Sequence, residues 1–130
     1  MLSQYPVYAS IPAKDIDRAK RFYVDVLGFT VQTVHSDGSL DFEAGDGTRF
    51  FVYPTQYAGT AKHTIAGFQV DDLDREIVSL KNKGIELEEY DIPGLKTIDG
   101  IATLGEEKSA WFKDSEGNII GVYEPAHAMV

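Results

Sequence analysis

The chain has 130 residues, which suits one domain or two small modules that share a core. Hydrophobic residues make up 43% and charged residues 25% of the sequence, as in soluble globular proteins, so disorder and fibrous repeats are excluded. The chain has 21 Asp and Glu and 12 Lys and Arg, which gives a net charge of −9. This charge disfavours nucleic acids and anionic membranes as partners. This acidity favours solubility, and as a functional feature it would suit a cationic ligand.

The chain contains no cysteine. Disulfides, thiolate zinc sites, iron–sulfur clusters and cysteine nucleophiles are therefore excluded. Residues 1–13 have neither a basic start nor an apolar run of signal-peptide length, and no run of apolar residues is long enough to span a bilayer. These features predict a cytoplasmic protein with no membrane partner.

The first predicted unit begins with an apolar, strand-like run at residues 7–11. Asp15 follows as a helix N-cap, because its short carboxylate can accept hydrogen bonds from the first turn. Apolar residues then recur at helical spacing until Gly28, which suits the left-handed position after the last turn. Two further strands are predicted at 29–33 and 48–53, and Phe42-Glu43-Ala44-Gly45-Asp46-Gly47 is typical of a strand end that enters a hairpin turn.

The second unit repeats this order. The stretch Val70-Asp71-Asp72-Leu73-Asp74-Arg75 matches Ala13-Lys14-Asp15-Ile16-Asp17-Arg18 and follows a strand-like run at 64–70. Asp72 is its predicted N-cap and Gly84 closes its helix. Strands are predicted at 85–89 and 118–123, and Phe112-Lys113-Asp114-Ser115-Glu116-Gly117 is the second hairpin turn.

Each unit therefore reads as one strand, one helix and three more strands. We predict a single domain over residues 1–130, with modules at 1–53 and 63–125 and a linker at 54–62. The second module is longer because of an insertion at 90–107, which is either a lid or a plain edge insertion. One helix covers only one face of a four-stranded sheet, so the other face must meet a module, a chain or a ligand.

The pattern resembles the vicinal oxygen chelate superfamily, which contains glyoxalase I, extradiol dioxygenases and bleomycin-resistance proteins. The resemblance implies an α+β fold in which two βαβββ modules form a curled mixed β-sheet cup with the helices outside. Members of this size usually pair, so the resemblance also implies a homodimer. Its most specific motifs are Lys14-Asp15-Ile16, Arg21-Phe22-Tyr23, Leu27-Gly28-Phe29, Trp111-Phe112-Lys113-Asp114 and Glu116-Gly117-Asn118.

Enzymes of this family hold a divalent metal through His, Gln or Glu on the first and last strand of each module. The matching positions in this chain are Tyr8, Phe51, Ile65 and Gly121, of which only Tyr8 could ever ligate. The resemblance therefore implies no metal site and no cofactor. His63 could reach the cup only with a register shift of two residues, and one imidazole makes no site. His35 and His127 are expected at the surface.

Without a metal, the cup is expected to be a small-molecule pocket with an apolar and aromatic lining. The resemblance supplies Tyr8, Phe51, Ile65 and Gly121, and strand alternation adds their neighbours on the same face. With Trp111, which corresponds in the second copy to Asp41 in the first, the predicted ligand-binding residues are Tyr8, Ser10, Arg49, Phe51, Tyr53, Ile65, Trp111, Gly121 and Tyr123. Gly121 is expected to leave open volume for a guest. Arg49 could pair with an anion, whereas Asp41 and Trp111 together would suit a flat cation. The alternative is that the aromatic side chains only fill the space between the modules.

The resulting functional prediction is a metal-free small-molecule-binding protein that sequesters a drug or metabolite, as bleomycin-resistance proteins do. The first alternative is a metal-dependent lyase, isomerase or dioxygenase with an atypical ligand set. The second is a structural or regulatory dimer without a ligand. Nucleophilic catalysis has little support, because none of the serines lies in a nucleophile elbow or has an obvious histidine partner.

Overall fold

The computed structural model describes residues 1–126, which form two compact units. The first unit comprises Met1–Thr60 and Ser115–Asn118, and the second comprises Ala61–Asp114 and the chain from Ile119 onward. A short turn from the second half of the sequence is thus part of the first unit. His127 lies outside the described residues.

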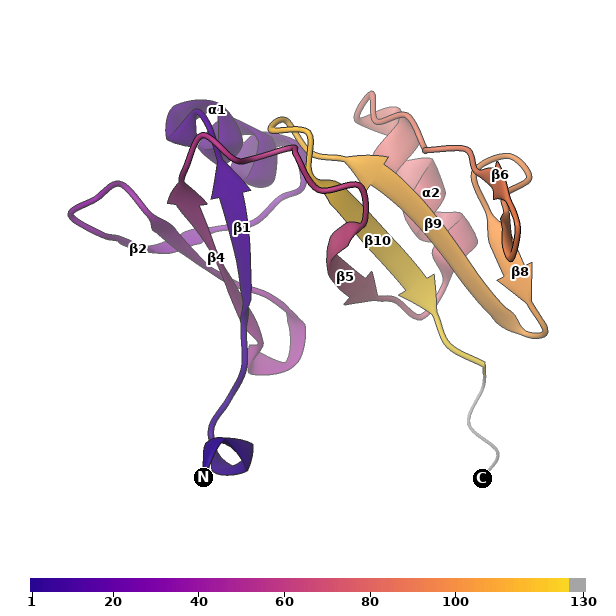
Figure 1. Ribbon diagram of the computed structural model, residues 1–130, viewed down its shortest axis with the longest axis horizontal. Coiled ribbons are helices and arrows are strands. Elements are labelled where there is room, and N and C mark those ends of the chain that lie inside the picture. Colours follow the sequence, from indigo (N-terminus) through magenta and orange to yellow (C-terminus); the bar gives the residue numbers. More distant parts are fainter. Residues whose placement is uncertain (127–130) are drawn as a thin grey trace. The chain divides into compact units, whose positions relative to one another are not determined.

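The first unit is a four-stranded mixed sheet with a helix on one face. Strand β1 is parallel to β4, the remaining pairs are antiparallel, and the order across the sheet is β1-β4-β3-β2 (Figure 1). In chain order its elements are η1 (Leu2–Gln4), β1 (Ala9–Ala13), α1 (Ile16–Arg21), η2 (Phe22–Val26), β2 (Val31–Val34), β3 (Leu40–Glu43), η3 (Gly45–Gly47) and β4 (Arg49–Pro54).

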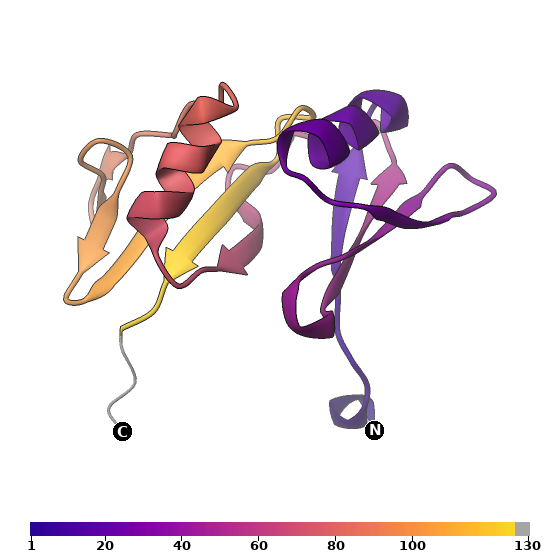
Figure 2. The same ribbon diagram turned by 180° about the vertical axis from the view of Figure 1, so that it is seen from behind.

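The second unit repeats this arrangement with the order β5-β10-β9-β8, and β5 is parallel to β10. Helix α2 packs against β10 and covers one face of its sheet (Figure 2). In chain order its elements are β5 (Thr64–Gln69), α2 (Leu73–Asn82), β6 (Asp91–Ile92), β7 (Leu95–Lys96), β8 (Ala102–Leu104), β9 (Glu107–Lys113) and β10 (Ile119–Glu124). The predicted α+β fold with two strand–helix–strand repeats is confirmed.

The predicted helix ends are confirmed. The Asp15 carboxylate accepts a hydrogen bond from the Arg18 N–H at 3.0 Å, and the Asp72 carboxylate accepts one from the Arg75 N–H at 3.2 Å. Gly28 and Gly84 both adopt a φ of 83°, the left-handed conformation that glycine tolerates best. The two capping aspartates and the two glycines therefore set the helix boundaries by local chemistry alone.

The first strand and helix differ from the sequence prediction in their extent. Strand β1 begins at Ala9 rather than at residue 7, because its pairing with β4 starts where Ala9 lies opposite Phe50. The predicted single helix is an α-helix only to Arg21 and continues as the π-helix η2, in which the Leu27 N–H donates to the Phe22 carbonyl. Apolar spacing does not distinguish these two helix types.

An aromatic cluster forms the core of the first unit. Tyr23 is fully buried and contacts Phe42 and Phe50, which stack with ring centroids 5.1 Å apart. Phe29 closes the cluster at 5.0 Å from Phe50. Phe42 and Phe50 occupy the helix-facing side of β3 and β4. Because side chains alternate along a strand, the neighbouring residues on each strand face the opposite side of the sheet.

The prediction of a strand at residues 85–89, on the edge of the second sheet, is wrong. No strand forms there; a single bridge joins Leu87 to Phe112, and the Glu88 N–H donates to the Trp111 carbonyl. The edge resumes at β8, which pairs with the other end of β9. The insertion therefore interrupts an edge strand, and it contains the small β6–β7 hairpin.

No helix in residues 1–126 is both long and apolar enough to cross a membrane.

Candidate functional site

The helix-free face of the first sheet is built by strand alternation. On β4, Phe50 and Val52 are buried toward the core, so Arg49, Phe51 and Tyr53 lie on the other face. Cross-strand register then places Phe51 between Ser10 of β1 and Asp41 of β3. It also places Glu43 opposite Arg49. The five residues that the sequence predicts here (Tyr8, Ser10, Arg49, Phe51 and Tyr53) come from β1, its N-terminal approach and β4.

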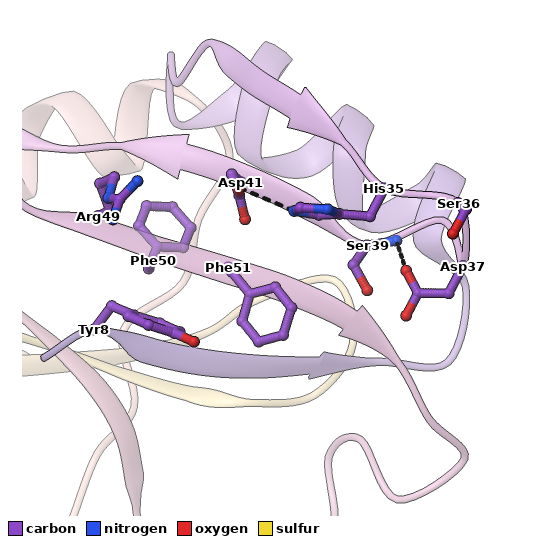
Figure 3. Close-up of a pocket in the computed structure, with 9 residues that line it drawn as sticks. All are labelled: Tyr8, His35, Ser36, Asp37, Ser39, Asp41, Arg49, Phe50 and Phe51. Atoms are coloured by element: carbon purple, nitrogen blue, oxygen red, sulfur yellow. Dashed lines mark hydrogen bonds and ion pairs between the residues drawn. The ribbon is translucent and has the colours of Figure 1, made fainter.

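A pocket of about 550 Å³ opens on this face (Figure 3). Such a volume is typical of sites for small organic molecules. Its lining residues are Tyr8, His35, Ser36, Asp37, Ser39, Asp41, Arg49, Phe50 and Phe51. Tyr8, Arg49 and Phe51 were predicted from the sequence as ligand-binding residues, and the structure brings them together in one pocket.

Aromatic rings form one wall of this pocket. The Tyr8 and Phe51 rings meet edge to face, with centroids 5.9 Å apart and planes at 88°. Phe51 also stacks against Tyr53 at 5.5 Å, which extends the aromatic surface along β4. Tyr8 is half exposed and Phe51 is half-buried, so the pair leaves ring surface open to the pocket instead of filling the core.

Both carboxylates on this face of β3 already have partners. Asp41 Oδ2 lies 3.0 Å from His35 Nε2 (Figure 3). Glu43 Oε2 accepts a hydrogen bond of 2.7 Å from Gln32 Nε2, although the residue directly across the strand pair is Arg49. Within residues 1–126, Arg49 has neither an ion pair nor a side-chain hydrogen bond. Its guanidinium therefore lines the pocket without a protein partner.

The opposite end of the pocket is polar. Asp37 accepts a hydrogen bond of 2.9 Å from the Ser39 N–H, and this bond holds the pKa of Asp37 below its ordinary value. The Ser39 residue is only 2% exposed, and its side chain also contributes to the lowered pKa of Asp37.

The sequence analysis missed four lining residues at this end: His35, Ser36, Asp37 and Ser39. The sequence analysis expected His35 only at the surface, and the residue is indeed exposed. The chain turns directly after it, and the Gly38 N–H donates to the His35 carbonyl. A signal was available, because Asp41 pairs with Thr33, two residues before His35, and the two side chains are therefore diagonal neighbours on one face of this hairpin.

Trp111 covers Gly121 in the second unit, which corrects the expectation of open volume there. The Trp111 indole reaches across β10 and donates a hydrogen bond of 3.1 Å from Nε1 to Thr64 Oγ1 on β5. A Cβ atom on Gly121 would lie 3.2 Å from Thr64 Cγ2 and 3.4 Å from Trp111 Nε1. Tyr90, at the start of the insertion, packs its ring 5.5 Å from the indole. A ligand on this face would meet Trp111 and not Gly121.

The two other predicted residues of the second unit have distinct environments. Ile65 lies at an irregularity in the β5–β10 pairing, where the register passes from Thr64 to Ala66. Tyr123 is half-buried at the end of β10. Burial raises the pKa of the Tyr123 phenol, and a hydrogen bond with Glu107 raises it further, so the phenol stays protonated at neutral pH.

The residues present do not fit a family-type divalent metal. Phe51, Ile65 and Gly121 offer no side-chain lone pair, and the only oxygen among the four positions is the phenol of Tyr8. His63 is exposed and its Nδ1 lies 3.1 Å from the neighbouring Thr64 carbonyl. Over residues 1–126, His, Asp and Glu side chains form no group of three or more that could hold a metal ion.

Comparison with known proteins places the chain in a family. The sequence profile described as Glyoxalase/Bleomycin resistance protein/Dioxygenase superfamily matches residues 6–122. The chain belongs to this superfamily. The resemblance identified from the sequence motifs is thereby confirmed.

Solved structures of superfamily proteins have the same fold. TnmS3, an antibiotic binding protein from Streptomyces sp. CB03234, superposes with a TM-score of 0.70 at 23% identity, over 94% of this chain and 96% of that one. A lactoylglutathione lyase from Agrobacterium tumefaciens gives 0.69 at 18% identity, covering 92% of each chain. A glyoxalase/bleomycin resistance protein from Streptomyces sp. CB03234 gives 0.65 at 24% identity, over 88% and 96%.

A search of curated protein sequences finds no match. The superfamily includes both binding proteins and enzymes, so membership alone does not select one activity for this chain.

Proposed function

We propose that this superfamily member binds a small organic molecule without a divalent metal and thereby sequesters a drug or metabolite. The observation that carries the proposal is the pocket of the first unit, which combines an aromatic wall with an unpaired guanidinium. Small-molecule sites combine apolar walls with polar groups that orient the ligand, and this pocket has both kinds of lining. The likeness in fold to an antibiotic binding protein supports the same function.

The proposed contacts extend beyond the pocket lining. Tyr8, Arg49 and Phe51 are the primary binding residues, and Ser10 and Tyr53 flank them on the same face. For the second unit, taken by itself, we propose a contact surface formed by Trp111 and Tyr123, with Ile65 and Gly121 supporting it from the backbone.

A thermal-shift screen against a library of small molecules tests the proposal. A ligand present at 100 times its Kd is expected to stabilise the protein by about 2.7 kcal/mol. The same ligand is expected to bind Phe51→Ala at least tenfold more weakly, because the aromatic wall is lost. Tyr57→Ala is the matched control, since Tyr57 is an exposed aromatic residue outside the pocket. A ligand with equal affinity for wild type and Phe51→Ala would contradict this site.

We expect purified protein to contain far less than one divalent metal ion per chain, because the positions of the family ligands hold Tyr8, Phe51, Ile65 and Gly121. Elemental analysis of protein prepared without chelator measures this directly. One equivalent of zinc, iron, manganese or nickel that His63→Ala abolishes would favour the alternative function, a metal-dependent lyase, isomerase or dioxygenase with an atypical ligand set.

We also propose that two copies of the chain pair. Residues 1–13 contain no charged side chain, and Val7 is 95% exposed in the segment that leads into the edge strand β1. Exposed apolar surface of this kind is typical of an interface. Sedimentation equilibrium at micromolar concentration is expected to give twice the chain mass of 14.4 kDa. Val7→Asp is expected to weaken pairing, whereas Val34→Asp on the exposed edge of β2 is the control. A wild-type monomer would contradict the proposal.

A further inference from the structure

We infer that the ligand of the first-unit pocket is a planar aromatic molecule with one negative charge, and that Arg49 binds this charge. The inference rests on the proposed binding function and names the chemical class of the ligand. It contrasts with the flat cation that the net charge of −9 and the sequence would suit.

Arg49 is available because its natural protein partner is engaged elsewhere. Glu43 lies directly across the β3–β4 pair from Arg49, yet its carboxylate bonds to Gln32 on β2. Arg18, Lys108 and Lys113 form ion pairs at 2.7, 3.1 and 3.4 Å, whereas Arg49 and the other Lys and Arg side chains of residues 1–126 form none. What distinguishes Arg49 is its place in this pocket, where it is the one Lys or Arg among the lining residues. A guanidinium presents two parallel N–H donors that match a carboxylate, so an unpaired arginine in a pocket favours an oxyanion.

The remaining charges of the pocket limit the ligand to one negative charge at the Arg49 end. Asp41 and Asp37 are the two carboxylates that line the pocket, and both lie toward the end formed by His35 and Ser39. A second anionic group placed there would be repelled by these carboxylates. A neutral part of the ligand meets no such repulsion at this end.

The surfaces between the two ends call for an aromatic ring. Tyr8 and Phe51 meet edge to face beside Arg49, so a third ring can join the same cluster. Arg49 precedes Phe51 by two positions on the same face of β4, so a ring stacked on Phe51 carries its substituent within reach of the guanidinium. An aromatic acid satisfies both contacts at once.

Three probes of nearly equal shape and different charge test this inference: 2-naphthoate, 2-naphthylmethanol and 2-naphthylmethylamine. Isothermal titration calorimetry at pH 7.5 (about 0.1 M salt, where exposed charges are only partly screened) compares their affinities. We expect 2-naphthoate to bind about tenfold more tightly than the alcohol and the amine to bind most weakly. Arg49→Met is expected to remove the advantage of the acid, so that the acid and the alcohol bind this variant with similar affinity. The preference of Arg49→Lys for the acid over the alcohol is expected to lie between those of wild type and Arg49→Met, because lysine keeps the charge but loses the paired donors.

Arg21→Met is the matched control, since Arg21 is an exposed arginine of the same unit outside the pocket. It makes the same change in net charge and is expected to leave the preference for the acid intact. Equal or tighter binding of the alcohol or amine would overturn the inference while leaving the proposed function standing. The inference would also be overturned if none of the three probes bound while the library screen yielded a ligand that Phe51→Ala no longer binds. A library screen with no ligand at all would overturn the proposed function itself.

Discussion

Replacing Glu116 with alanine is expected to lower the free energy of unfolding by about 3 kcal/mol, because a buried, fully bonded carboxylate is lost. Its side chain is 0% exposed and accepts hydrogen bonds from Arg18 Nε at 2.7 Å, Arg18 Nη2 at 3.0 Å and the Asp15 N–H at 2.8 Å. Ser115 Oγ adds a fourth at 2.9 Å. The carboxylate thus holds the N-terminus of α1 from the turn between β9 and β10.

The contribution of Glu116 is expected to depend on pH. Burial would raise the pKa of Glu116, but the hydrogen bonds from Arg18, the Asp15 N–H and Ser115 outweigh it and hold the pKa below the ordinary value of 4.5. A carboxyl with a depressed folded-state pKa stabilises the protein above its unfolded-state pKa, and this stabilisation is lost as the pH falls through the folded-state value. The effect is therefore complete at neutral pH and fades below pH 4.5.

Urea titrations of wild type and Glu116→Gln between pH 7 and pH 3 measure this dependence. The difference in unfolding free energy is expected to be largest at neutral pH and to narrow at acidic pH, where the wild-type carboxyl is also neutral. Glu106→Gln is the control, because Glu106 is exposed and its replacement is expected to change stability by less than about 0.5 kcal/mol. A difference for Glu116→Gln that persists unchanged at pH 3 would show that the ionised form makes no special contribution.

Gly121→Leu is expected to destabilise the protein by about 2–3 kcal/mol, because the new side chain enters space that Trp111 and Thr64 already occupy. To make room, the indole has to move and give up its hydrogen bond to Thr64 Oγ1. Trp111 is the only tryptophan, so its fluorescence reports the displacement directly. A red shift of the emission is expected together with the loss of stability in a denaturant titration.

The neighbouring glycine provides a matched control. Gly67 pairs with Gly121 in the sheet, but a Cβ there would find only the Gly121 carbonyl oxygen, at 3.8 Å. We therefore expect Gly121→Ala to lower stability and shift the emission, while Gly67→Ala changes stability by less than about 0.5 kcal/mol. Equal effects at the two positions would mean that strand propensity, and not the Trp111 cover, decides the outcome.

The edge of the second sheet, around the insertion, is the part of the fold that the sequence predicted least accurately. Residues 85–88 alternate apolar and acidic side chains as a half-buried strand does, and the sequence offers no reason to divide the edge there. In the structure, Leu87 and Glu88 pair with one end of β9 and residues 102–104 with the other. Which segment pairs with β9 depends on competition between segments distant in the sequence, and a local pattern cannot resolve such a competition.

Some residues of the candidate site could be predicted from local sequence and others could not. Alternation along β4 predicted that Arg49, Phe51 and Tyr53 share the face opposite the core, because successive side chains of a strand point to opposite sides. The lining by His35 and Ser39 was missed, because it depends on which side of the turn faces the sheet. The pairing of Glu43 with Gln32, which leaves Arg49 unpaired, is a choice between two cross-strand neighbours.

The sequence by itself determined the repeat, the helix ends and the hairpin turns, since each depends on residues a few positions apart. Asp15, Asp72, Gly28 and Gly84 act through the backbone of their own turns, so their effect is readable without a fold. Only the tertiary structure decided that Trp111 lies over Gly121 and that Glu116 caps the start of α1. Those contacts join residues from separate segments, and their geometry exists only once the sheets have formed and fixed the direction of each side chain.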